Sequence, residues 1–108
     1  MTDFKKANTD ATITQLIVDS PRAVLFLSAE WCGDCRVLDP FLPELCDTIS
    51  QTATWVSADR DDNLAVAQEY KLRGIPAFVL FENGKEITRL GTGQRLTPQE
   101  ILAWYQDN

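Results

Sequence analysis

The feature that most constrains this chain is the segment "EWCGDC", in which two residues separate Cys32 from Cys35 and a tryptophan precedes the first cysteine. This spacing lets the two sulfurs meet in a tight loop, and it is typical of a redox-active pair or of two metal ligands. The chain contains no histidine, which excludes Cys–His and Ser–His nucleophile pairs and histidine-containing zinc sites. Any catalysis must therefore use Cys, Asp, Glu, Lys or Tyr side chains.

The residues around the cysteine pair predict a strand followed by a helix. The continuous apolar run Ala23–Ala29 is typical of a strand covered on both faces. Apolar residues recur at helical spacing over Gly33–Ile49, and Pro40 lies inside this pattern, so we expect a helix with a kink at the proline. Cys32 then lies at the carboxyl end of a strand and the amino end of a helix, where open α/β sheets place their active sites.

The remaining elements alternate between helix and strand, which predicts an α/β fold. We expect helices at Thr9–Val18, capped by Thr9 or Asp10, and at Asn63–Lys71, capped by Asp61 or Asp62 and ended before Gly74. Strands are expected at Ala53–Ala58 and Ala77–Phe81, and a hairpin turn at Asn83-Gly84 leads into a returning strand over "EITRLG". A capping box of Thr97, Pro98 and Glu100 opens the last helix. Alternating strands and helices imply parallel pairing, and the hairpin adds an antiparallel edge. The sequence thus predicts one domain over residues 1–108, with helices on both faces of a central mixed sheet and a further short strand at the N-terminus.

The composition of the chain excludes several classes of partner. Its formal charge is −6, so it repels nucleic-acid phosphates, and it has no basic cluster for an anionic membrane surface. The longest apolar run is far shorter than the roughly 20 residues of a membrane span, and the N-terminal lysines are not followed by the apolar stretch of a secretory signal. We therefore expect a cytoplasmic protein, in which a Cys-x-x-Cys pair is more often catalytic or metal-binding than structural.

The expected position of Cys32 favours a reactive thiolate. The free amides of the first helical turn and the positive end of the helix dipole stabilise a thiolate, and helix N-termini lower the pKa of a cysteine from ~8.5 to roughly 3.5–7.5. Arg36 adds a nearby positive charge. Cys35 lies one turn deeper, so one thiol can attack a substrate and the other can release it. Trp31 is expected to shield the outer sulfur and to offer substrates an apolar contact.

With the segments "AEWCGDC" and "RGIPAFVLFENGK" in this order of elements, the chain resembles thioredoxin from about residue 10 onward. A Trp-Cys-Gly-x-Cys core with a downstream Gly-Ile-Pro is a highly specific combination. The resemblance implies a thioredoxin fold and a protein-disulfide reductase, with Cys32 as the nucleophile and Cys35 as the resolving cysteine. It implies disulfide-containing proteins and a thioredoxin reductase or equivalent as partners, a monomer, and no cofactor or metal. The supporting residues are then Trp31, Gly33, Asp34 and Arg36.

The resemblance also implies a substrate-binding surface beside the cysteine pair. Pro76 matches a proline that is cis in thioredoxins and faces the two cysteines, and Ile75 precedes it. We expect the backbone of Ile75 to pair with an extended substrate segment, as in strand addition, and Trp31 to contact that segment. Gly91 or Gly93 matches a glycine that lets the substrate approach the rim of the site.

Three positions depart from the thioredoxin pattern. Asp34 stands where the family usually has proline, Phe26 where it has a buried aspartate, and Ser57 where a lysine accompanies that aspartate. Two interpretations of Asp34 follow. As a first-turn residue it stabilises the helix, whereas as an anion near two sulfurs it raises the pKa of a thiol and makes the protein a stronger reductant. In the second interpretation it also accepts the proton of Cys35 in place of the missing buried acid.

The cysteines and the function also admit other interpretations. Tetrahedral zinc needs four ligands, and the chain has three cysteines, so a zinc site within one chain is not expected. Cys46 lies on the apolar stripe of its helix and is expected to be a small buried group. The alternative function is a thioredoxin-fold binding or scaffold protein, or a specialised redox partner that the general thioredoxin reductase does not serve.

Overall fold

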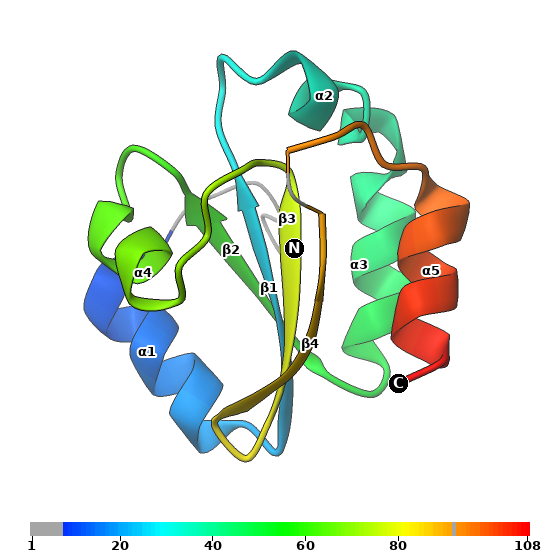
Figure 1. The fold of residues 1–108 in the computed structure, drawn as a ribbon. Coiled ribbons are helices and arrows are strands. Elements are labelled where there is room, and N and C mark those ends of the chain that lie inside the picture. Colours follow the sequence, from blue (N-terminus) through cyan, green and yellow to red (C-terminus); the bar gives the residue numbers. More distant parts are fainter. Residues whose placement is uncertain (1–7, 92) are drawn as a thin grey trace.

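The computed structural model describes residues 8–91 and 93–108, in which helices cover both faces of a four-stranded sheet (Figure 1). The elements are α1 (Asp10–Asp19), β1 (Arg22–Ser28), α2 (Gly33–Arg36), the 3₁₀ helix η1 (Asp39–Phe41), α3 (Leu42–Ser50), β2 (Thr54–Asp59), α4 (Leu64–Glu69), β3 (Ala77–Glu82), β4 (Lys85–Leu90) and α5 (Pro98–Gln106). The expected N-terminal strand falls outside the described residues. None of the described helices is long and apolar enough to cross a membrane.

The predicted mixed sheet is confirmed, with strand order β2-β1-β3-β4. β1 and β2 are parallel, whereas β3 is antiparallel to β1 and β4 is antiparallel to β3. The alternation of strands and helices predicted that β3 would also pair in parallel, and this part of the prediction is wrong. The reason is that α4 has six residues and β2 also has six, and six residues span about 9 Å as a helix but about 20 Å as a strand. The chain thus enters β3 at the sheet end where it left β2, and Pro76 lies beside the end of β1.

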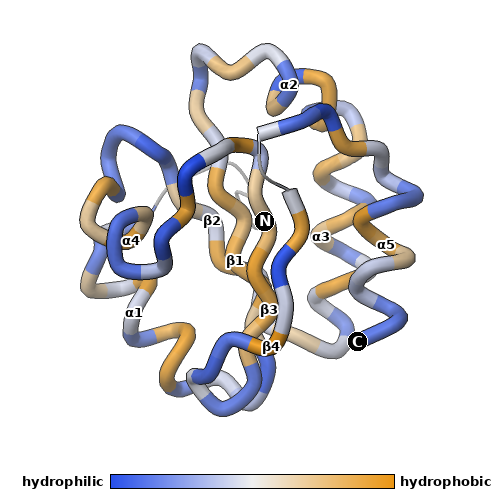
Figure 2. The backbone as a smooth tube through the Cα atoms, in the orientation of Figure 1, coloured by the Kyte–Doolittle hydropathy of each residue, from blue (hydrophilic) through white to orange (hydrophobic). Residues whose placement is uncertain are grey.

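Two apolar cores lie on opposite faces of the sheet, and β1 contributes to both. Leu25 and Leu27 pack with side chains of α1 and α4 on one face, whereas Val24 and Phe26 pack with those of α3 and α5 on the other. Figure 2 shows the apolar character of the central strands against the hydrophilic loops around them. Burial on both faces explains why β1 reads as a continuous apolar run.

The helix expected over Gly33–Ile49 is wrong as a single element, because the chain forms α2, η1 and α3 there. Pro40 has no N–H to donate, and its ring clashes with the carbonyl four residues earlier. The backbone accommodates the proline with tighter bonds, in which Leu38 N–H donates to Cys35 O at 3.0 Å and Phe41 N–H donates to Leu38 O at 2.9 Å. The proline therefore divides the helix instead of kinking it.

Both ends of α4 also differ from the expectation. Its N-cap is Asn63, which makes no side-chain capping bond, and neither expected aspartate caps it. The Asp59 carboxylate instead accepts from the backbone N–H groups of Asp61 and Asp62, which closes the turn before the helix. At the other end the helix stops at Glu69 instead of the expected Lys71, and Lys71 itself adopts the left-handed conformation (φ 56°) that is typical after a helix C-terminus.

The remaining turn and cap predictions are confirmed. Asn83 and Gly84 both have positive φ, 53° and 82°, as a two-residue hairpin turn requires. Thr97 accepts from the Glu100 backbone while the Glu100 side chain accepts from the Thr97 backbone, which completes the capping box of α5. These local signals were strong because each depends on residues only a few positions apart.

Candidate active site

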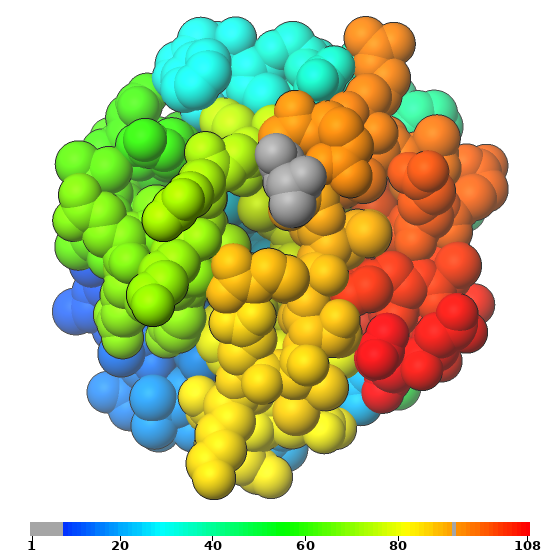
Figure 3. All heavy atoms as spheres, in the orientation of Figure 1, coloured from blue at the N-terminus to red at the C-terminus, as the bar shows by residue number. Residues whose placement is uncertain are grey.

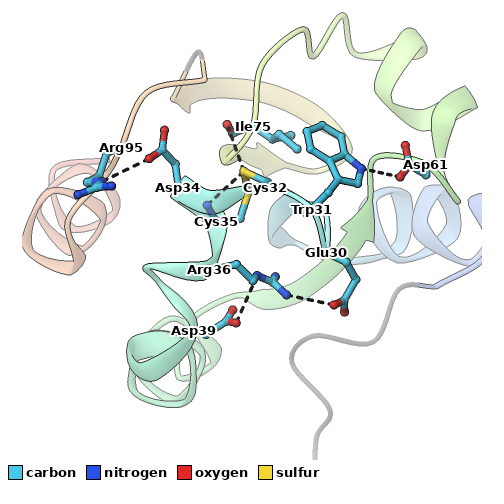
Figure 4. Close-up of a disulfide and its surroundings, with 10 residues drawn as sticks. All are labelled: Glu30, Trp31, Cys32, Asp34, Cys35, Arg36, Asp39, Asp61, Ile75 and Arg95. Atoms are coloured by element: carbon cyan, nitrogen blue, oxygen red, sulfur yellow. Dashed lines mark hydrogen bonds and ion pairs between the residues drawn. A yellow bond between two sulfur atoms is a disulfide. The ribbon is translucent and has the colours of Figure 1, made fainter.

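Cys32 and Cys35 lie where β1 gives way to α2, and a disulfide joins them (Figure 4). Cys32 is the N-cap of α2, as predicted, and its Sγ accepts a hydrogen bond from the Cys35 backbone N–H at 3.1 Å. Because α2 has only four residues, its dipole is weaker than that of the long helix expected from the sequence. The hydrogen bond from the Cys35 N–H is therefore the main local interaction that stabilises negative charge on the outer sulfur, Cys32 Sγ.

The two cysteines differ in their access to solvent. Cys32 is 6% exposed and Cys35 is fully buried. Ala29 and Ile75 complete a small apolar cluster around the pair. A partner that approaches from solvent therefore meets the sulfur of Cys32 first.

The segment at residues 74–76, called here the cis-proline loop, lies against the disulfide. The Ile75–Pro76 peptide bond is cis, as the resemblance to thioredoxin implied. The carbonyl oxygen of Ile75 lies 3.8 Å from Cys32 Sγ, which brings the backbone of the loop next to the outer sulfur. The loop and the cysteine pair thus form one surface, although they are separated by some forty residues of sequence.

The two candidate glycines lie against the backbone of this loop. Gly91 has φ 95°, and a Cβ there would lie 2.5 Å from the carbonyl oxygen of Pro76. Gly93 has φ 97°, and its Cβ would lie 3.3 Å from the Cα of Gly74. Only glycine combines this conformation with so close an approach at position 91. Gly91 therefore allows its segment to pack closely against the backbone of the cis-proline loop.

Gly33 and Trp31 leave the surface around the sulfurs open. A Cβ at Gly33 would meet no atom within 4 Å, so no packing demands a glycine there. Trp31 is 66% exposed, and its indole N–H donates to the Asp61 carboxylate at 2.7 Å. This bond fixes the ring and leaves its apolar face free for contact. The sequence did not indicate Asp61, because its segment was interpreted as a helix cap.

Arg36 does not supply the positive charge expected beside the sulfurs. Its guanidinium pairs with the Asp39 carboxylate at 3.3 Å and with the Glu30 carboxylate at 3.4 Å. Figure 4 shows the side chain directed away from the disulfide, towards these two carboxylates. Two nearby anions offset the charge of Arg36, so it adds little to the stability of a thiolate on Cys32.

Asp34 pairs with a residue that sequence reasoning missed. Its carboxylate accepts from Arg95 Nε at 3.3 Å, and Figure 4 shows it turned towards Arg95 and away from the sulfurs. Both side chains are more than one third exposed, so the pair contributes about 0–1 kcal/mol to stability. Arg95 lies 61 positions away along the chain, and no local pattern signals the contact.

The positions of the missing acid–base pair lie side by side, as the resemblance implied. Phe26 on β1 is in register with Ser57 on β2, and both are buried. The Phe26 ring stacks on Phe78 with centroids 4.8 Å apart, and its centroid lies 5.6 Å from that of Trp55. Ser57 Oγ accepts from the Trp55 indole N–H at 2.9 Å. Aromatic packing and a neutral hydrogen bond thus occupy the place of a buried charge pair.

In the described part of the chain, the third cysteine and the acidic side chains do not form a metal centre. Cys46 is buried on α3, where its Sγ lies 3.6 Å from Ser50 Oγ. Within residues 8–91 and 93–108, no group of three or more Cys, Asp or Glu side chains is arranged to hold a metal ion.

Comparisons with known proteins give a consistent result. A protein-family model for thioredoxin matches residues 3–106. Thioredoxin 1 of Synechococcus elongatus is 35% identical over 98 residues, which cover 90% of this chain and 89% of that protein. The thioredoxin of Buchnera aphidicola is 32% identical over 99 residues, with 90% and 91% covered.

Solved structures show the same fold. Mitochondrial thioredoxin 3 of Saccharomyces cerevisiae in its oxidized form superposes with a TM-score of 0.80 at 24% identity, covering 96% of this chain and 94% of that chain. The oxidised thioredoxin of Plasmodium falciparum gives a TM-score of 0.77 at 20% identity, with 90% and 89% covered. The shared architecture therefore persists at low sequence identity.

Proposed function

The chain belongs to the thioredoxin family and is a thiol–disulfide oxidoreductase; from this premise we propose that it reduces protein disulfides with Cys32 as nucleophile and Cys35 as resolving cysteine. The observation that carries this assignment is the difference between the two sulfurs. Cys32 caps α2 and reaches the surface beside Ile75, whereas Cys35 is fully buried beneath it. The outer sulfur can meet a substrate, and the inner sulfur can meet only the outer one.

The proposed reaction moves two electrons from the dithiol to the substrate. The Cys32 thiolate attacks one sulfur of the substrate disulfide, that S–S bond breaks, and one substrate thiolate leaves as a mixed disulfide forms. Cys35 then loses its proton and attacks the Cys32 sulfur, which releases the second substrate thiolate and leaves the Cys32–Cys35 disulfide. The Cys35 backbone N–H, 3.1 Å from Cys32 Sγ, favours the thiolate that begins the cycle.

The substrate is proposed to dock along the cis-proline loop. An extended segment pairs with the backbone of Ile75 beside Pro76, in the manner of strand addition. The exposed ring of Trp31 gives this segment an apolar contact, and Gly91 lets the chain pack closely against the loop. Docking through backbone and apolar contacts suits a reductase that acts on many proteins.

The source of electrons, the cellular location and the oligomeric state are further parts of the proposal. A thioredoxin reductase or an equivalent reductant regenerates the dithiol, and the protein acts as a monomer in the cytoplasm. The family membership supports the reductase.

Insulin reduction tests the proposed function in two steps. We expect the protein to accelerate the reduction of insulin disulfides by dithiothreitol, and also to do so with NADPH and thioredoxin reductase as the electron source. Reactions that lack the protein give the background rate. Activity with dithiothreitol alone would favour a specialised redox partner, and no activity with either electron source would leave the scaffold alternative.

Replacement of Asp34 by asparagine separates its two interpretations. Because Asp34 pairs with Arg95 and not with a sulfur, we expect Asp34→Asn to leave the pH dependence of mixed-disulfide resolution unchanged. Removal of an anion near Cys32 should lower the pH at which Cys32 alkylation reaches half its maximal rate, and Arg95→Gln should raise it. A changed pH profile of the resolution step in Asp34→Asn would restore the proton-acceptor interpretation.

A further inference from the structure

A pocket of about 360 Å³ lies beside the cis-proline loop, and three cationic side chains line it. Arg60 comes from the turn after β2, Lys71 from the end of α4, and Arg73 from the approach to the cis-proline. The other lining residues are apolar or neutral: Leu64, Ala67, Gln68 and Leu72. In Figure 3 the yellow-green segment after α4 lies on the face towards the viewer, between green α4 and the yellow hairpin. The three cations and this wall are called the cationic pocket below.

The cations of this pocket have no carboxylate partner within the described part of the chain. Eight of the ten lysines and arginines lie there, since Lys5 and Lys6 fall outside it. Four of the eight form ion pairs with Asp or Glu, namely Arg22, Arg36, Arg89 and Arg95. Of the remaining four, Lys85 lies on the hairpin and the other three line the pocket. Among the described residues, three of the four lysines and arginines without a carboxylate partner thus line one pocket, in a chain whose net charge is −6.

The wall of the pocket is fixed before any ligand arrives. The Arg89 guanidinium reaches across from β4 and donates to the carbonyl oxygens of Tyr70 at 2.9 Å and Lys71 at 3.3 Å. The charge of Arg89 itself is neutralised by Glu86, whose pKa is lowered by the hydrogen bond from Arg89. Lys71 adopts a left-handed backbone conformation, which glycine adopts with less steric strain than lysine. The turn itself therefore does not require the charged side chain at this position. A preformed wall lowers the entropic cost of binding.

The cationic pocket flanks the surface where the substrate is proposed to dock. Arg73 precedes Ile75 by two residues, which span at most about 7 Å of chain. Ile75 in turn contacts Cys32 Sγ through its carbonyl oxygen. On the other wall, Arg60 precedes Asp61, which fixes the ring of Trp31. A segment docked at Ile75 therefore continues past the cations within a few residues of its attacked cysteine.

We propose that the cationic pocket binds acidic side chains of the disulfide substrate, so that the protein prefers substrates with Asp or Glu within about two to five residues of the attacked cysteine. This inference rests on the proposed reductase function and names its substrate class. The carboxylates pair with the three cations, and the apolar lining accepts the methylene groups that carry them. Opposite charges chiefly accelerate association, and salt weakens that effect.

Two matched disulfide peptides test the preference. They are identical except that one carries two aspartates and the other two asparagines, placed three and four residues from the cysteine. The measurement is the rate constant at which the pre-reduced protein reduces each peptide at low ionic strength. We expect wild type to reduce the acidic peptide roughly three to ten times faster, and the difference to shrink in 0.5 M salt.

Variants of the pocket separate this preference from general effects. The triple variant Arg60→Gln, Lys71→Gly, Arg73→Gln should lose the preference and keep its rate with the asparagine peptide. Lys71→Gly suits the local backbone, and a thermal unfolding curve confirms that the variant is folded. The matched control is Lys85→Gln, which removes the fourth cation without a carboxylate partner among the described residues and should keep the preference.

The outcomes distinguish a failure of the acidic-substrate preference from a failure of the reductase function on which it rests. Equal rates for the two peptides in wild type, or a preference that survives in the triple variant, would overturn the acidic-substrate assignment. Failure to reduce either peptide would instead contradict the reductase function itself. Binding of wild type, but not the triple variant, to anionic phospholipid vesicles without a peptide preference would overturn the assignment in favour of a membrane surface.

Discussion

Cys35→Ser should form a mixed disulfide with its substrate and hold it, while its multiple-turnover reductase activity falls to the uncatalysed rate. The attacking sulfur of Cys32 stays at the N-terminus of α2, beside the cis-proline loop. The group that would release the substrate is gone, because a serine hydroxyl does not attack a disulfide at neutral pH. Mass spectrometry of the variant after incubation with a disulfide peptide measures the adduct, and the same variant in cell extract captures the physiological partners.

Two further cysteine variants give this experiment its controls. Cys32→Ser should form no adduct, and Cys46→Ser should turn over at the wild-type rate because Cys46 is buried on α3. A buried hydroxyl at position 35 costs about 1–3 kcal/mol, so Cys35→Ala serves as a second trapping variant that avoids it. An adduct on Cys46, or full turnover in Cys35→Ser, would contradict the assigned roles.

The parts of the site that could be predicted are those encoded by neighbouring residues. The N-cap position of Cys32 followed from an apolar strand that runs into a helical pattern, and the hairpin and capping box followed from their turn residues. The division of the helix at Pro40 was underestimated. The proline signal was clear, but the sequence pattern did not show that the backbone would adopt tighter bonds over Asp39–Phe41.

The parts that could not be predicted depend on contacts between distant segments. The pairing of Asp34 with Arg95 joins positions 61 apart, and that of Trp31 with Asp61 joins positions 30 apart. The cationic pocket has the same origin, since Arg60 and Arg73 line it from the two segments that precede and follow α4. Side-chain periodicity carries information about which face of an element is buried, and it carries none about which exposed charges meet.

The substitution of the buried acid by Phe26 leads to the second large expected effect. Phe26→Asp should lower the free energy of unfolding by at least about 3–5 kcal/mol at neutral pH, because it removes a buried aromatic ring. The ring stacks on Phe78 and is 2% exposed. The new carboxyl would enter this apolar cluster opposite Ser57, which offers it no cation. A domain of this size has roughly 5–15 kcal/mol of stability, so a large share of it would be lost.

The pH dependence of this loss identifies the buried charge as its cause. Burial raises the pKa of the introduced carboxyl in the native state above its unfolded value of about 3.9. Between the two pKa values the native state binds more protons than the unfolded state, so stability falls as the pH rises above about 4. Phe26→Ala is the control, because it also loses the packing of the ring but introduces no group whose charge changes with pH. Denaturant unfolding of both variants at several pH values measures the difference in their free energies of unfolding. Because β1 and β2 place residues 26 and 57 in register, adding Ser57→Lys should recover part of the loss at neutral pH, which a purely steric effect of the aspartate would not allow.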